Sequence, residues 1–241
     1  MAAEMELKRI PSPPRIVATS GIVFSGLFIA SLVLIRLAAP ADPKDPGVWL
    51  SDPALRDWVS MSLNLVPFTG IAFLWFMAVL RNHIGLLEDR FFATVFLGSG
   101  LLFVAMLFAA VAVTRGLMDA FASADGILVQ PETYQLGRSM AFALMNTFCM
   151  KMAAVFMFVT STIGLRTAVL SHWLSFVCFS FGLVLLLVMA DFAWIALLFP
   201  LWVLLVSAFI LYKGFNKDST NLVSDRVGES QAERRNDHFN A

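Results

Sequence analysis

Lys151 is the residue of this 241-residue sequence whose type and position point most strongly to chemistry. It follows Cys149-Met150 inside a long apolar stretch of the chain. A lysine at the centre of a bilayer costs about 3 kcal/mol on insertion scales, so such residues are rare. They usually face the interior of a helix bundle and mark substrate or proton pathways. We therefore place Lys151 at the centre of a predicted polar pocket.

Four other polar residues complete this predicted pocket, in the outer half of the helix bundle. Thr147 shares the helix face of Lys151, and Asp191 is the nearest plausible counter-charge. Arg36, near the outer end of the first apolar stretch, borders the pocket. The predicted substrate-binding members are Lys151, Asn64, Thr69, Thr147 and Asp191.

Three interpretations of Lys151 stay open at this point. In the first, its ammonium binds an anionic substrate group or moves a proton. In the second, it has a structural role and its ammonium donates hydrogen bonds to backbone carbonyls and to Asn64. In the third, it snorkels along the helix surface toward the headgroups. Asp191 has its own alternative, because an aspartate before a helix is a good N-cap.

The composition predicts an all-α membrane protein, because 59% of the residues are apolar and only 14% are charged. Soluble domains are nearer 45–50% apolar and about 25% charged. A membrane-spanning helix needs about 20 mostly apolar residues. Six stretches meet this condition and predict a bundle of six transmembrane helices: 16–38, 58–80, 91–113, 139–165, 168–189 and 192–212.

Basic residues predict the orientation of these six helices. The side that holds both termini carries eleven lysines and arginines, and the other side carries four. The positive-inside rule therefore places both termini in the cytoplasm. Ala39-Pro40-Ala41 after the first stretch resembles a signal-peptide cleavage site. The apolar run before it exceeds the usual 7–15 residues, so we favour an uncleaved first helix.

The chain has no segment long enough to form a separate soluble domain. Residues 1–15 are a short cytoplasmic segment, 16–212 the transmembrane domain, and 213–241 a polar cytoplasmic tail that we expect to be disordered.

Residues 115–124 predict a short helix lying on the membrane. Pro67 and Pro200 fall inside predicted helices. Small residues at four-residue spacing, including Gly21 and Ser25, predict close helix contacts.

Several function classes lack the residues that they require. The histidines, at positions 83, 172 and 238, are all expected outside the hydrocarbon, so we expect no haem and no other cofactor. No Cys, His and carboxylate cluster predicts a metal site. No nucleophile has a base beside it, so we predict no catalytic residue and no enzyme. The net charge of zero gives no indication of nucleic-acid binding.

The segments 67–76 and 88–103, and the run Lys151-Met152-Ala153-Ala154 with Thr160-Ser161-Thr162, resemble a group of bacterial multi-pass membrane proteins without an assigned function. This resemblance implies the bacterial inner membrane and carries no activity or cofactor. We expect a non-enzymatic accessory or structural component that contacts the lipid bilayer and a membrane-protein partner or a second copy. The alternative is a small transporter or channel that uses the pocket around Lys151.

Overall fold

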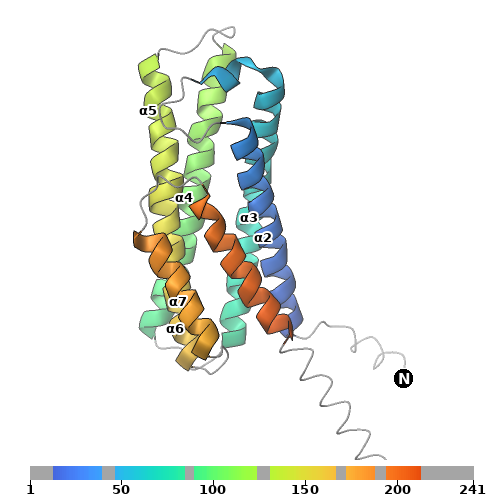
Figure 1. Cartoon of the computed structure of the whole chain (residues 1–241), viewed down its shortest axis with the longest axis vertical. Coiled ribbons are helices and arrows are strands. Elements are labelled where there is room, and N and C mark those ends of the chain that lie inside the picture. Colours follow the sequence, from blue (N-terminus) through green and yellow to red (C-terminus); the bar gives the residue numbers. More distant parts are fainter. Residues whose placement is uncertain are drawn as a thin grey trace, which may run out of the picture.

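The computed structural model describes residues 13–39, 47–84, 90–123, 131–166, 172–187 and 194–212, and this part of the chain is helical with no strand. The all-α prediction is thus confirmed. In chain order the elements are α2 (Pro13–Ala38), η2 (Val48–Ser51), α3 (Pro53–Ile84), α4 (Arg90–Ser123), α5 (Pro131–Phe142), the π-helical η3 (Ala143–Cys149), α6 (Met150–Arg166), α7 (His172–Leu187) and η4 (Ile195–Leu197), which opens a last helix running to Tyr212 (Figure 1).

Five of these helices are long and apolar enough to cross a membrane: Ala18–Ala38, Pro53–Arg81, Arg90–Ala122, Pro131–Arg166 and Ile195–Tyr212. They coincide with five of the six predicted spans. The remaining stretch forms α7, whose 16 residues extend about 24 Å at 1.5 Å per residue. It is therefore shorter than the roughly 30 Å hydrocarbon core of a bilayer.

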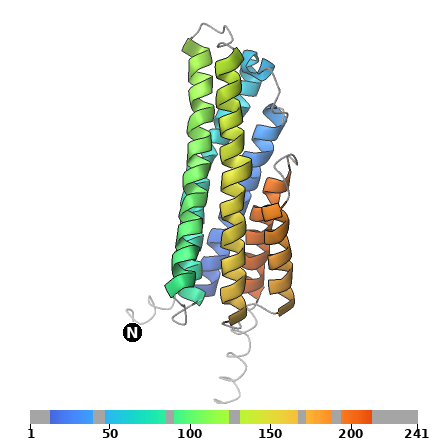
Figure 2. The ribbon, with the colours of Figure 1, turned by 90° about the vertical axis from the view of Figure 1, so that its left-hand side faces the viewer.

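The helices have two different heights. Figures 1 and 2 show α2, α3, α4 and the α5–η3–α6 rod running the length of the bundle, whereas α7 and helix 195–212 cover only its lower half. Pro131–Arg166 alone has 36 residues, or about 54 Å at the same rise. Among the described helices of more than one turn, only these four reach the upper half, which we call the four-helix end. The end that carries Arg81, Arg90 and Arg166 is the basic end.

Two helices extend further than predicted. The predicted third span ends at 113 with a separate helix over 115–124, but α4 continues through this region to Ser123. No proline interrupts it, and Arg115 and Asp119 form an i,i+4 ion pair of 3.9 Å along it. The fourth span is predicted from 139, but its rod begins at Pro131, a residue favoured at the first helical position.

Buried aromatic rings fill the lower and middle part of the bundle. Phe73 is fully buried and lies between rings from four other helices. Its centroid is 5.0 Å from Phe24, 4.9 Å from Phe103, 5.2 Å from Phe156 and 5.7 Å from Phe199. This layer joins α2, α3, α4, α6 and helix 195–212 in one core.

Small residues on α2 bring helix 195–212 close, as predicted. The Ser25 hydroxyl donates to the Gly21 carbonyl at 2.8 Å and to the Pro200 carbonyl at 2.9 Å. A side chain on Gly21 would collide with Ser207 Oγ. Gly26, on another face of α2, has nothing near its missing Cβ. Pro67 and Pro200 lie inside their helices.

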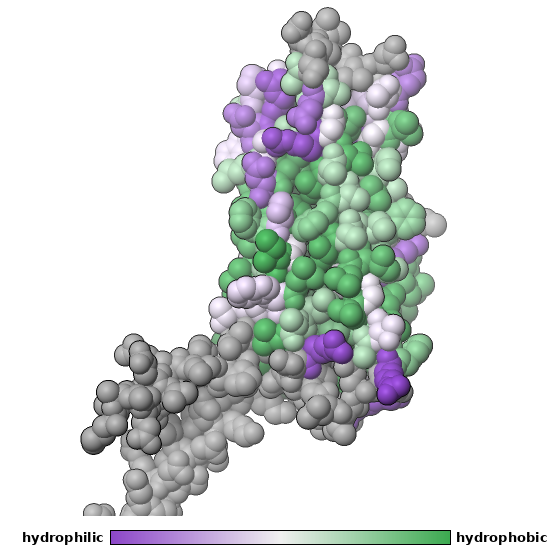
Figure 3. Space-filling model, turned by 180° about the vertical axis from the view of Figure 1, so that it is seen from behind, coloured by the Kyte–Doolittle hydropathy of each residue, from purple (hydrophilic) through white to green (hydrophobic). Residues whose placement is uncertain are grey.

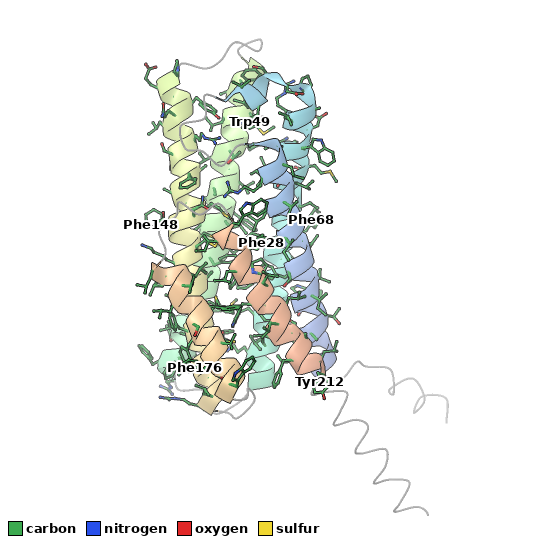
Figure 4. The ribbon with its side chains drawn as sticks, in the orientation of Figure 1. Phe28, Trp49, Phe68, Phe148, Phe176 and Tyr212 are labelled. Carbon is green, nitrogen blue, oxygen red and sulfur yellow. The ribbon has the colours of Figure 1, made fainter. Side chains whose placement is uncertain are left out.

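The surface is divided along the bundle axis. Seen from behind, hydrophobic residues cover the lower and middle parts of the molecule, and hydrophilic residues gather near the top (Figure 3). Large apolar side chains such as Phe68 and Phe176 project outward from this hydrophobic part (Figure 4). This arrangement is the one expected of a multi-pass membrane protein, whose apolar side chains face lipid.

Candidate functional site

None of the four described members of the predicted pocket lines the cavity that the structure contains. Lys151 on α6 and Asn64 on α3 are exposed. Thr69 is buried, and its hydroxyl donates to the Leu65 carbonyl of its own helix at 3.0 Å. Thr147 is half-buried in η3. Asp191 lies outside the described residues, so its predicted role as a counter-charge or N-cap stays a prediction.

The height of Lys151 explains its outward position. Lys151 lies 15 residues, or about 22 Å, from Arg166 at the end of α6. Leu187, the last residue of α7, lies the same distance from His172, the first residue of α7. Lys151 is therefore level with the end of α7, well away from the middle of the apolar region. Its side chain points toward the N-terminal end of its helix, where polar residues gather. This exposure favours the snorkelling interpretation.

A different polar cavity lies between α2, α3, α4 and the α5–η3 segment, at the four-helix end. Its volume is about 150 Å³. Figure 4 shows two of its lining residues, Phe28 and Trp49, at different heights in the bundle. The polar side chains that line it are Arg36, Arg138, Asn146, Tyr134, Trp49, Thr114, Ser31 and Ser62. The rest of the lining is almost wholly apolar.

The upper end of the cavity is organised around the Tyr134 hydroxyl. Trp49 Nε1 donates to this oxygen at 3.2 Å, and Arg138 Nη1 donates to it at 3.3 Å. Gly47, just before η2, packs against the Tyr134 ring with φ of 85°, a backbone conformation that side chains disfavour. Arg56 Nη1 donates to the Leu50 carbonyl at 3.1 Å and so holds η2 against the top of the bundle.

Two arginines, Arg36 and Arg138, line this cavity, and none of its described lining residues carries a carboxylate. Arg36 Nε and Asn146 Oδ1 are buried and lack a hydrogen-bond partner within the described part of the chain. Asp52, which lines a neighbouring hollow with Arg36, accepts a hydrogen bond from Ala54 N at 2.9 Å at the start of α3.

The wall formed by η3 departs from regular α-helix. Its seven π-helical residues contribute Met145 and Asn146 to the cavity. Asn146 Nδ2 donates to the Phe142 carbonyl at 3.2 Å, which leaves its amide oxygen available. π-helical segments are uncommon and occur often at functional sites. The wider turn therefore directly follows α5, and both segments of the rod line the cavity.

The polar end of the cavity lies beyond the apolar middle of the bundle. Thr114 is 24 residues, about 36 Å, from Arg90, and Asn146 is 20 residues, about 30 Å, from Arg166. A hydrocarbon core that begins at the basic end and is about 30 Å thick ends at this height. The two guanidinium groups are thus at or above the level of the far headgroups, where charge is tolerated.

Sequence reasoning missed most of this site. The sequence places Arg36 at the border of a pocket, and it does line the cavity, but no sequence pattern indicates Trp49, Tyr134 or Arg138. The available signal was a pair of arginines at the outer ends of two spans. Tyr134 is 85 residues from its partner Trp49, a pairing that no local pattern indicates.

Comparison with known protein families, with curated proteins and with solved structures found no match. The fold and the cavity therefore carry the functional argument. Within the described residues, no three His, Cys, Asp or Glu side chains are grouped so that they could hold a metal ion. The described lining carries two guanidinium groups and no carboxylate, which suits an anion better than a cation.

Proposed function

We propose that this chain is a non-enzymatic multi-pass membrane protein that binds an anionic group in the cavity of its four-helix end. The observation that carries the proposal is the presence of two guanidinium groups, Arg36 and Arg138, in a lining without a carboxylate. Guanidinium groups bind carboxylates and phosphates through charge-assisted hydrogen bonds. The buried Arg36 Nε supplies a donor that nothing else in the described structure accepts.

The eleven-to-four count of lysines and arginines in the sequence supports the predicted orientation, which we retain as part of the proposal. Arg81, Arg90 and Arg166 share the basic end, and this end would face the cytoplasm of a bacterial inner membrane. Both termini would then be cytoplasmic, and the cavity would face the opposite side. The ligand would reach it from the outer headgroup region or from the water beyond.

The core below the cavity favours binding over transport. Phe73, Phe103 and Phe199 are fully buried, and their centroids are 4.8–5.7 Å apart. Rings packed this closely fill the bundle between the cavity and the basic end. The transporter alternative depends on a pocket around Lys151, which is exposed instead. A membrane-protein partner or a second copy remains part of the proposal, and co-purification under mild detergent tests it.

The experiment measures how butyrate changes the thermal unfolding of the protein in a neutral detergent, with chloride at equal concentration as the reference. A ligand that binds only the folded state raises stability by RT ln(1 + [L]/Kd). We expect butyrate to raise the unfolding temperature of the wild type. Arg36→Gln and Arg138→Gln should each weaken this effect at least about 10-fold in apparent Kd.

The matched control is Arg115→Gln. Arg115 is an exposed arginine at the same end of the bundle, and its Nη1 donates to Ser60 Oγ at 3.1 Å. It does not line the cavity, so its removal should leave the butyrate effect unchanged. An equal loss in Arg36→Gln and Arg115→Gln would show general charge attraction. Such a result, or no effect of butyrate on the wild type, would overturn the proposal.

A further inference from the structure

The cavity is elongated along the bundle axis and has two chemically different ends. On α2 its lining extends from Phe28 to Ala39, which is 11 residues or about 17 Å. On α4 it extends from Leu107 to Leu117, about 15 Å. The basic groups lie toward the top of this length, and the deeper part is apolar. A small inorganic anion would fill only the upper end.

The deeper part is lined by side chains from three helices. Phe28 and Leu32 from α2, Val66 from α3 and Leu107 from α4 are all buried. Phe28 is eight residues below Arg36 on the same helix, which places it about 12 Å deeper. One ligand could therefore have a charged head near Arg36 and an apolar tail near Phe28.

We infer that the ligand is a single-chain amphiphile with an anionic head, held with its head at Arg36 and Arg138 and its chain directed toward Phe28. The inference rests on the proposed anion site and adds the second half of the ligand. The head is a carboxylate or a phosphate, because both accept the fork of donors that an arginine presents. Tyr134 and Trp49 close the head end through their shared hydrogen bond of 3.2 Å.

The volume limits the length of the chain. A 150 Å³ apolar cavity in another protein holds one benzene molecule, which has six carbons. The cavity described here has the same volume and a longer shape. It therefore accommodates about six carbons in all, that of the head included, and a longer chain must leave the cavity or displace its walls.

The test extends the butyrate measurement to hexanoate, octanoate and dodecanoate, with hexyl phosphate and neutral octanol as further probes. We expect the apparent affinity to rise at least about 10-fold from butyrate to octanoate, because methylenes leave water. It should then level off at dodecanoate. Octanol should bind weakly, because it lacks the anionic head. Hexanoate and hexyl phosphate together identify which head is preferred.

A pair of substitutions on α4 separates the cavity from general membrane partition. Ala110 is buried and lines the cavity, so Ala110→Leu should fill it and remove the gain with chain length while butyrate still binds. Ala105 is exposed, so Ala105→Leu should change nothing. If Ala110→Leu does not fold, crosslinking of a diazirine-bearing octanoate to wild type gives an independent result. Labelled peptides should contain Phe28, Leu32 or Leu107.

The outcomes distinguish the two proposals. Butyrate binding that depends on Arg36 without a gain in affinity at greater chain length would overturn the amphiphile and leave the anion site. A chain-length gain that is equal in Ala110→Leu, or crosslinks confined to exposed residues such as Phe68, would also overturn it. Loss of all dependence on Arg36 for every probe would overturn both proposals.

Discussion

Replacing Phe73 by alanine should destabilise the bundle strongly, whereas the same change at Phe68 should not. Both residues are on α3, five positions apart. Phe73 is fully buried, and Phe68 is 62% exposed. The comparison therefore tests which face of α3 contacts the other helices and which face contacts lipid.

The magnitude follows from the ring contacts of Phe73. Five rings surround it, with centroids 4.9–6.3 Å away: Phe24, Phe76, Phe103, Phe156 and Phe199. Each aromatic pair contributes about 0.5–1.5 kcal/mol beyond the area that it buries. Inside a membrane, transfer from water adds little, because lipid is as apolar as the core. We therefore expect a loss of about 3 kcal/mol for Phe73→Ala, the low end of buried Phe→Ala changes.

The assay is equilibrium unfolding of each variant in mixed micelles with increasing denaturing detergent, followed by far-UV circular dichroism. Phe68→Ala should change the free energy of unfolding by less than about 0.5 kcal/mol, as for other surface substitutions. A loss at Phe68 equal to that at Phe73 would show that α3 presents a different face to the bundle. The cavity, which uses the Val59, Leu63 and Val66 face of the same helix, would then be refuted as well.

Three further predictions concern single positions. Gly21→Leu should prevent close packing against Ser207 and lower the unfolding temperature, whereas Gly26→Leu, with open space at its Cβ, should have little effect in the same thermal assay. Gly47→Ala should cost about 1–2 kcal/mol, because φ of 85° disfavours a Cβ and that atom would lie 2.6 Å from Tyr134 Cζ; denaturing-detergent unfolding measures it. Lys151→Met should leave the apparent Kd for octanoate within about twofold of wild type, because an exposed side chain beyond the cavity removes no ligand contact. A large rise in that Kd would instead support the pocket predicted around Lys151.

Apolar composition and run length were enough to predict the helices. A stretch of about 20 apolar residues without charge has few stable alternatives to a helix in lipid, because every backbone polar group must be satisfied internally. The predicted bounds were too short for α3, α4 and the 131–166 rod. Polar residues such as Arg115 and Glu132 can extend a helix beyond the bilayer, and hydropathy does not record where such a helix ends.

Which face of each helix points into the bundle depends on packing that the sequence does not specify. Lys151 has the residue type and the apolar surroundings of an intramembrane site, and its neighbours gave no indication that it faces outward. Its exposure depends on the height of α7 and on the π-helical turn that precedes α6. A rotation of one residue about a helix axis moves a side chain by about 100°, so small changes in local winding decide which residues meet.

The sequence by itself therefore determined that this protein is helical and that most of its helices are apolar enough for a membrane. Only the tertiary structure placed Arg36 and Arg138 around one cavity and closed it with Trp49 and Tyr134. The physical reason is the separation along the chain between the residues that interact. Apolar run length is a local property of the chain, whereas the cavity is lined by residues of α2, α3, α4 and the α5–η3 segment, which are far apart in the sequence.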